Sequence, residues 1–242
     1  MSIVLPKVYP SAPVMGQPAP YRMPSRERKE QLIAVAMKLF ARKGFRGTTT
    51  KEIAKAAGVN QAILFRHFAS KDELYAAILD HKARKSNSAA WIEELRAIAE
   101  RRDDEALFRA VMEKTLEHGR RDQDFTRLML FSALEGHKLA QSFRDKRVRP
   151  VFRFLCDYIA LRQKEGAFRA VEPAVVVRAI FGIPSYHAQV VSLFHCRLLT
   201  LRDEEAARKF AELILTGLKM TSGTKKVLKR SNGSSANPDL RG

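Results

Sequence analysis

The side chains with the most specific hydrogen-bonding chemistry lie between Gln61 and Arg66. The amide of Gln61 can donate and accept at once, which matches the edge of an adenine base. Arg66 can bind a guanine edge or a phosphate. Ala62 and Ile63 offer only apolar surface, which suits the methyl group of thymine. All four residues would also suit an ordinary solvent-facing helix surface. Whether they can contact bases depends on the helices that position them.

A short capped helix is predicted just before this segment. Thr49 and Glu52 have the spacing of a capping box, so the helix should begin near Thr50. Gly58 fits the left-handed residue just past its end. The apolar face of this helix is expected to consist of Ile53, Ala54 and Ala57.

A second short helix is predicted over about Gln61 to Phe68, and Asn60 is a favourable N-cap for it. Helical spacing buries Leu64 and Phe68. The residues expected to face outward are Gln61, Ala62, Ile63 and Arg66.

The next helix should begin near Lys71, because Ser70 and Glu73 form a second capping box. Only about three residues separate the two short helices, whereas an ordinary helical hairpin carries a less constrained turn. Two short helices around a tight turn are the geometry that places one helix in the major groove of DNA. The segment therefore predicts a helix-turn-helix.

This segment resembles the DNA-binding domain of TetR-family transcriptional repressors, with a close match over roughly Arg26 to Lys82. The matching residues are Gly44, Phe45, Gly47, Thr48, Thr49, Ile53, Ala54, Ala57, Gly58, Val59, Leu64, Phe65, His67, Phe68, Lys71 and Leu74. Beyond them the chain is similar in length, in helical pattern and in the phrase EGAFRAVEPAVVVRAIFG. The resemblance implies an all-α fold, with a three-helix DNA-binding domain before a larger ligand-binding and dimerisation domain. It also implies a repressor that a small molecule releases from a palindromic operator.

Further residues are expected to hold the DNA backbone. Main-chain N–H groups at a helix N-terminus favour phosphate. The first short helix begins with Thr49, Thr50 and Lys51. The resemblance assigns further phosphate contacts to Phe65, His67 and Lys71.

Two positions depart from the family pattern. Position 65 is usually Tyr, whose hydroxyl meets a phosphate, whereas Phe65 can only pack against sugar. Ile63 replaces a commoner small or hydroxylated residue, so an operator sequence does not transfer from a relative. His67 has an alternative role, in which its imidazole packs at the helix interface.

Charge favours a polyanionic partner. The 242-residue chain has a formal net charge of +18 and a pI of about 10.2. Residues 26–85 hold fourteen Lys and Arg against six Asp and Glu, and residues 219–242 hold six against one. The alternative is that many of these lysines only improve solubility.

The expected domain organisation has four parts: a Pro-rich flexible arm (1–24), the helix-turn-helix domain (25–70), a helical sensing and dimerisation domain (71–220), and a basic flexible tail (221–242). Helices are predicted near 26–43, 50–57, 61–68, 71–85, 88–100, 104–121, 124–137, 139–165 with an interruption near Pro150, 173–196, and 203–220. Asp104 is predicted to cap the helix that it begins.

The composition indicates a cytoplasmic protein without cofactor or membrane span. No charged region followed by an apolar core marks a signal peptide. Cys156 and Cys196 lie in apolar helical stretches, which favours small buried thiols over a disulfide or a metal site. The longest uncharged run lies between Arg178 and Arg197 and contains Pro, Ser, His and Gln, which makes it a poor membrane helix.

A large apolar interior is predicted after residue 87, and the resemblance implies a ligand cavity inside it. The candidate pocket residues are Phe125, Met129, Phe152, Tyr158, Phe181, Tyr186 and His187. At helical spacing such residues also serve as ordinary core. Pro184 removes a backbone donor and predicts a kink near this pocket. The apolar lining suggests a lipophilic or aromatic effector, which would tilt the helix from Lys71 to about Lys85.

One helix-turn-helix buries little surface, so a homodimer on double-stranded DNA is expected. The resemblance implies that the last two long helices pair with their twins. The candidate interface residues are Val176, Ile180, Ile183, Val191, Phe210, Leu213 and Ile214. The alternative is that both apolar stripes are internal core.

Three other functions have weaker support in the sequence. An enzyme is disfavoured, because the sequence has no HExxH, CxxC, GxSxG or phosphate-binding glycine loop. A metal sensor using His187, His195 and Cys196 is a variant of the main interpretation. A non-specific architectural DNA binder, favoured by the basic tail, would bind all sequences equally.

Overall fold

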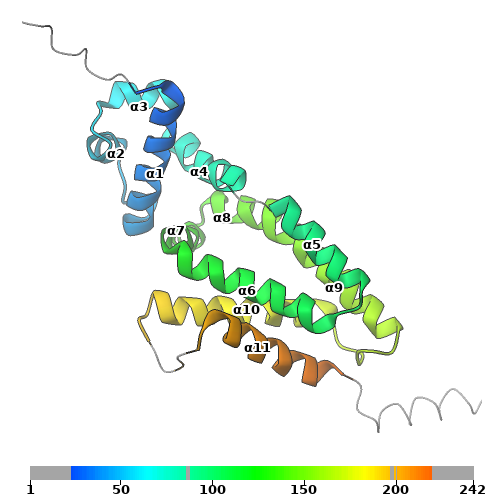
Figure 1. The fold of residues 1–242 in the computed structure, drawn as a ribbon. Helices are drawn as coiled ribbons and strands as arrows, with labels where there is room; N and C mark the ends of the chain where they lie inside the picture. The colour runs from blue at the N-terminus through cyan, green and yellow to red at the C-terminus, as the bar shows by residue number, and fades with distance from the viewer. Residues whose placement is uncertain (1–22, 86–87, 197–198, 200, 220–242) are drawn as a thin grey trace, which may run out of the picture.

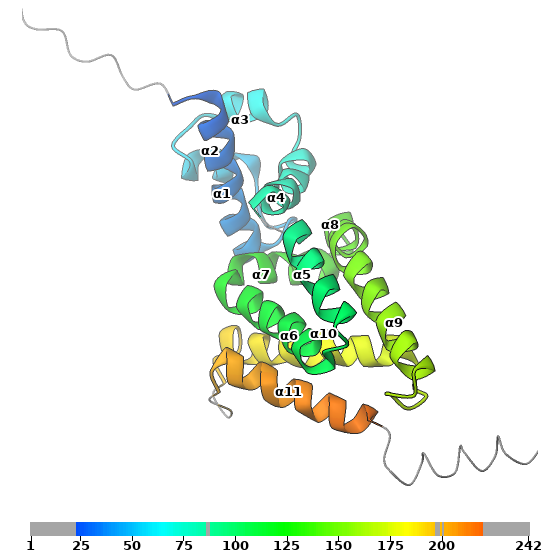
Figure 2. The ribbon, with the colours of Figure 1, turned by 45° about the vertical axis from the view of Figure 1, so that its right-hand side comes forward.

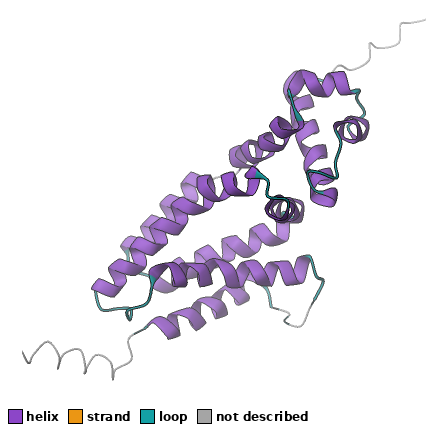
Figure 3. Cartoon of the chain, turned by 180° about the vertical axis from the view of Figure 1, so that it is seen from behind, coloured by secondary structure: helices purple, strands orange, loops and turns teal. Residues whose placement is uncertain are grey.

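The computed structural model describes residues 23–85, 88–196, 199 and 201–219, and the elements over this range are helical (Figure 3). Residues 1–22 of the predicted arm and the whole predicted tail lie outside the described residues. The helices are α1 (Ser25–Lys43), α2 (Thr50–Ala56), α3 (Gln61–His67), α4 (Lys71–Lys85), α5 (Ser88–Glu100), α6 (Asp104–Arg121), α7 (Gln123–Leu134), α8 (Lys138–Phe143), α9 (Arg149–Lys164), α10 (Pro173–Ser192) and α11 (Asp203–Leu218). The predicted all-α fold is confirmed.

The predicted interruption near Pro150 is a single π-helical turn, Arg144–Val148, which joins α8 to α9. Proline has no N–H, so the backbone near Pro150 cannot keep a regular α-helical ladder. Pro150 itself lies in the first turn of α9, where a missing donor costs little. Helix α10 ends at Ser192 rather than 196, and it is continuous through the buried Pro184.

The N-terminal helices form their own hydrophobic core. Its largest members are Phe40, Phe68 and Tyr75, whose side chains come from α1, the end of α3, and α4. Leu128 of α7 is fully buried in the same core. The expected boundary at residue 70 therefore cuts through a packed unit, because α4 and α7 complete the apolar surface that α1 to α3 leave open.

A second core lies around α6, which packs against α5, α10 and α11. Phe108 and Met112 of α6 are fully buried there, and α9 adds Leu155 and Ile159. Figures 1 and 2 show α1 to α3 at one end of the molecule and α10 beside α11 at the opposite end. Helix α4 lies between the two ends.

The start of α6 differs from the sequence prediction. Asp103, not Asp104, caps the helix, since its carboxylate accepts from the Ala106 N–H at 2.9 Å. Asp104 instead accepts two bonds of 2.9 Å from the guanidinium of Arg162 and one of 2.6 Å from the Tyr158 hydroxyl. This largely buried pair joins α6 to α9. The hydrogen bonds to Asp104 are the largest cause of the raised pKa of Arg162. Burial is the largest cause of the raised pKa of Tyr158, followed by its hydrogen bond to Asp104.

Among the described helices, α10 is the one whose length and hydropathy would suit a membrane span, a test that core helices of soluble proteins also pass. Only 28% of that stretch is buried within the protomer. Its outer side therefore presents apolar residues to whatever surrounds the protein.

Replacing Asp104 should destabilise the protein more than replacing an exposed acid. Asp104→Ala leaves the largely buried Arg162 guanidinium with only Glu165 as its acidic partner and removes three hydrogen bonds, which costs about 3 kcal/mol in the free energy of unfolding. Glu113→Ala, which breaks the exposed pair with Arg109, should cost less than about 1 kcal/mol. Chemical denaturation measures both, and equal losses would contradict a structural role for the Asp104 pair.

Candidate DNA-binding site

The predicted capping box at the start of α2 is confirmed. The Thr49 hydroxyl accepts from the Glu52 N–H at 3.2 Å, and the Glu52 carboxylate accepts from the Thr49 N–H at 2.9 Å. Lys43 at the end of α1 adds an ion pair of 2.6 Å to the same carboxylate. These bonds hold the Glu52 carboxylate in its charged form and lower its pKa to about 2, with the bond from Lys43 as the largest cause.

The turn between α2 and α3 also follows the sequence prediction. Gly58 adopts a φ of +68°, the left-handed conformation that favours glycine. The Asn60 side chain caps α3 by accepting from the Ile63 N–H at 2.9 Å. At the start of α4, half of the predicted capping box forms: the Ser70 hydroxyl accepts from the Glu73 N–H at 3.1 Å. The Glu73 carboxylate accepts from the Ala69 N–H at 2.6 Å, one residue before the predicted partner.

Helix α3 presents a definite outer face. Leu64 and Phe68 are buried at 0% and 1% exposure, as predicted. The exposed residues are Gln61, Ala62, Phe65 and Arg66. Ile63 is half-buried rather than fully outward, because at 100° per residue it lies on the flank of the helix. Phe65 is 47% exposed, so its ring is available for packing against another molecule.

Gln61 is oriented by a residue of α2. Its amide nitrogen donates to the Thr50 hydroxyl at 3.0 Å, across the helix-turn-helix. The contact leaves the amide oxygen and the second N–H available. Thr50 therefore orients Gln61 in addition to starting α2. Its neighbours Thr49 and Lys51 are exposed.

Lys71 is tied inside the protein. Its ammonium donates to the carbonyl oxygens of Phe45 and Thr48 at 2.8 and 3.0 Å and lies 4.1 Å from the centroid of the Phe45 ring. Two of its three N–H donors are thus used by the turn that precedes α2. The phosphate contact that the resemblance assigns to this side chain stays a prediction.

His67 is half-buried on the flank of α3. Burial lowers its pKa, and the positive charges of Lys29, Arg66 and Arg28 lower it further. The imidazole is therefore neutral near pH 7 and can offer an N–H to a phosphate, but not a positive charge.

The predicted pocket residues are spread over both cores. Phe125 and Met129 pack on the N-terminal core. Phe152, Tyr158 and Phe181 belong to the core around α6, and Tyr186 is 68% exposed. His187 lines a cavity of about 350 Å³, together with Leu116, Arg120, Ala188, Val191, Ser192, Leu199, Leu201, Arg202 and Asp203. The structure therefore does not bring the seven predicted residues around one cavity.

The predicted dimer residues separate into two groups. Val176 and Ile180 are buried in the protomer's own core, which removes them from any surface. Leu213 is 67% exposed and Val191 is 38% exposed, while Ile183, Phe210 and Ile214 are half-buried. Helix α10 also turns Val175 and Tyr186 outward, and Tyr186 was predicted for the pocket instead of the interface.

The described residues contain no group of three or more His, Cys, Asp or Glu that could hold a metal ion. His187, His195 and Cys196 are thus not assembled as a site there. Cys156 and Cys196 are both free and partly covered.

Residues 32–78 match the family model described as bacterial regulatory proteins, tetR family. The N-terminal helices therefore form a DNA-binding domain of the TetR-family type. The matched range starts in α1 and ends in α4, so it contains the complete helix-turn-helix.

Similar proteins carry the same type of domain. The HTH-type transcriptional activator FasR of Mycolicibacterium smegmatis is 40% identical over 67 residues, which cover 28% of this chain and 31% of FasR. The alignments span about a third of the length of FasR and of the next curated relative. The HTH-type transcriptional regulator RutR of Escherichia coli is 24% identical over 197 residues, which cover 79% of this chain and 91% of RutR.

Solved structures share the fold. A crystal structure of AibR in complex with isovaleryl coenzyme A and operator DNA superposes with a TM-score of 0.56 at 21% identity, covering 77% of this chain and 97% of AibR. A mutant HlyIIR structure gives a TM-score of 0.58 at 16% identity, covering 82% and 98% of the two chains.

Acid should loosen the start of α2. The pKa of Glu52 is lowered from 4.5 to about 2, so its stabilising effect is complete above pH 4.5 and is lost as the pH falls toward 2. An NMR titration of the Glu52 side-chain carbon should give a midpoint well below 4.5. The variant Lys43→Ala should move that midpoint upward, and an unchanged midpoint would contradict the assigned cause.

Proposed function

We propose that this protein is a sequence-specific DNA-binding transcriptional regulator, acting as a homodimeric repressor that a small apolar molecule releases from a palindromic operator in the cytoplasm. The observation that carries the proposal is the outer face of α3, where Gln61 and Arg66 stand exposed on a helix held by caps and by a buried core. Enzymatic activity is not part of the proposal.

The electrostatics of the N-terminal helices support a DNA partner. Arg26, Lys29 and Arg42 on α1 are exposed, as are Lys51 and Lys55 on α2. Exposed Lys and Arg side chains can bind phosphates. Phosphate contacts fix a protein on the duplex, while base contacts give the sequence preference. Gln61 and Arg66 would supply base contacts, and Ala62 with Phe65 would supply apolar contact.

The outer side of α10 and α11 supports a homodimer. Val175, Tyr186 and Leu213 are large apolar residues that the protomer leaves exposed on these adjacent helices. Exposed apolar residues on adjacent helices favour contact with a second copy, and a two-fold dimer fits a palindromic site. Val176 and Ile180 would support this interface from within, by fixing α10 on α6.

The helices around α6 are the proposed sensing region. Phe152, Tyr158 and Phe181 gather in an apolar interior, which suits a lipophilic or aromatic effector. Such an effector would act by binding one arrangement of α4 better than another, and its effect is limited to that difference in affinity.

Selection of binding sites from random DNA tests the proposed function. The wild-type protein should enrich one palindromic sequence, and Gln61→Ala should lose discrimination at one base pair of each half-site by about 1–3 kcal/mol. Thr50→Val removes the hydroxyl that orients Gln61 and should relax the same position to a smaller extent. Lys55→Ala serves as the control, because loss of a positive charge weakens binding to all sequences alike.

Equal enrichment of all sequences would refute the proposed specificity and favour an architectural binder. A reporter gene placed behind the selected site then separates repression from activation. Increased expression on addition of the protein would refute the repressor assignment.

A charge on the outer face of α11 should break the dimer. Leu213→Glu places a carboxylate in the proposed apolar interface and should convert the protein to a monomer in sedimentation experiments. Glu212→Ala changes the neighbouring exposed residue and should leave the dimer intact. A wild-type protein that sediments as a monomer would refute the interface.

A further inference from the structure

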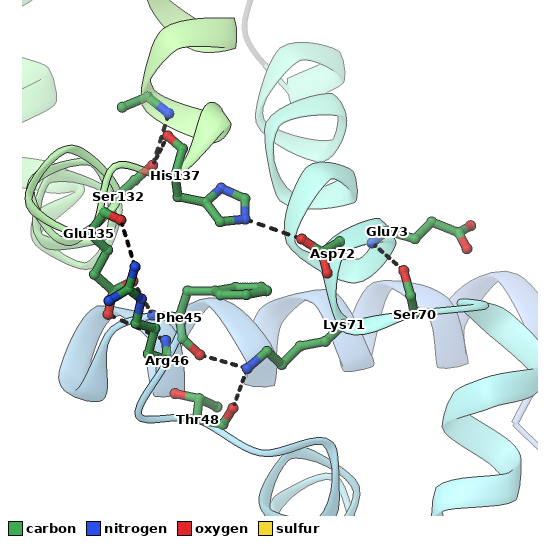
Figure 4. Close-up of polar contacts among 11 residues, drawn as sticks. Phe45, Arg46, Thr48, Ser70, Lys71, Asp72, Glu73, Ser132, Glu135 and His137 are labelled. Carbon is green, nitrogen blue, oxygen red and sulfur yellow. Dashed lines mark hydrogen bonds and ion pairs between the residues drawn. The ribbon is translucent and has the colours of Figure 1, made fainter.

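The C-terminal end of α7 binds the turn that leads into α2. The carboxylate of Glu135, directly after α7, accepts from the backbone N–H of Phe45 at 2.9 Å and of Arg46 at 3.3 Å. The Arg46 guanidinium donates back to the Glu135 carbonyl oxygen at 3.4 Å (Figure 4). The sensing part of the chain thus satisfies backbone donors of the DNA-binding part.

This contact depends on the absence of a side chain at Gly44. Gly44 has a φ of +72°, and a Cβ built on it would lie 2.3 Å from one carboxylate oxygen of Glu135. A side chain at this position would displace the Glu135 carboxylate, and the left-handed φ itself favours glycine. Gly44 is one of the residues that carry the family resemblance, and in the structure it leaves room for the contact between this turn and the end of α7.

The other side of the same turn is held by α4. Lys71 donates to the carbonyl oxygens of Phe45 and Thr48, and the Thr48 hydroxyl donates to the Gly44 carbonyl oxygen at 2.8 Å. Figure 4 shows the turn between the Lys71 ammonium on one side and Glu135 on the other. Residues 44–48 are thus fixed by two elements that lie far apart in the sequence.

His137 extends the contact to the start of α4. Its ring lies 4.5 Å from the ring centroid of Phe45 and 4.6 Å from that of Tyr75, and its Nε2 lies 3.3 Å from a carboxylate oxygen of Asp72. Ser132 fixes the segment that carries the imidazole, because its hydroxyl donates to the His137 carbonyl oxygen at 3.2 Å and accepts from the Ala140 N–H at 2.9 Å. The imidazole therefore stands between the turn, α4 and the junction of α7 with α8.

We propose that Glu135 and His137 are positioning residues for DNA binding, which set the placement of α2 and α3 from the sensing part of the protein. We call them, with Arg46, the α7 clamp. Thr50 begins α2 only two residues after the turn ends, so a shift of the end of α7 reaches the helix-turn-helix directly. This route starts at the end of α7, and it also touches the start of α4 at Asp72 and Tyr75. The inference rests on the proposed function, since it names a control of the same DNA-binding site.

Hydrogen exchange tests the clamp without DNA or effector. In Glu135→Ala the backbone N–H groups of Phe45 and Arg46 lose their acceptor, so their exchange should accelerate by about tenfold or more. Glu135→Gln keeps a carbonyl acceptor and should give a smaller change. Glu94→Ala, at an exposed position of α5, is the control and should leave both rates unchanged. Unaltered exchange in Glu135→Ala would overturn the clamp.

Binding to the DNA selected by the wild-type protein tests the positioning role. Glu135→Ala and His137→Ala should each bind that DNA at least about fivefold more weakly than Glu94→Ala does, at a temperature where all three variants remain folded. Faster exchange with unchanged affinity would refute the positioning role. If the wild-type protein selects no sequence, the proposed function fails, while the exchange experiment still decides whether the clamp exists.

Discussion

The shortness of α2 and α3 is the constraint on which the rest of the structure depends. Each has seven residues, and a helix of that length does not persist in water because its nucleation cost exceeds the gain from its few hydrogen bonds. Side-chain caps and core contacts compensate for this. Side-chain caps at Thr49 and Asn60 satisfy free backbone donors, and Leu64 and Phe68 fix α3 on a core that longer helices provide.

That core is larger than the DNA-binding segment. Leu74 and Tyr75 of α4 and Leu128 of α7 are as deeply buried in it as Phe40 of α1. The segment that would meet DNA is therefore packed against two elements that continue into the sensing part. A change in α4 or α7 cannot leave α2 and α3 undisturbed, because packed interiors transmit displacement instead of absorbing it.

The far end of the molecule has the opposite character. Around α6 the interior is held by apolar packing and by the Asp104–Arg162 pair, while α10 and α11 keep apolar residues on their outer sides. This distribution fits the proposed homodimer, in which the exposed apolar residues of α10 and α11 would pair and each copy would present one α3 to DNA.

The sequence by itself determined the local structure. Caps, the left-handed Gly58 and helical spacing depend on residues a few positions apart, so the start of α2 and the buried face of α3 could be predicted from Thr49, Asn60 and Leu64. The tertiary structure alone decided what lies across the fold: Asp104 pairs with Arg162 instead of capping α6, Lys71 is tied to the turn before α2, and Glu135 meets Phe45. It also placed Val176 and Ile180 inside the protomer and left Tyr186 outside. An apolar stripe in the sequence indicates only that its residues will be buried. Which helix buries them depends on how helices distant in the sequence pack.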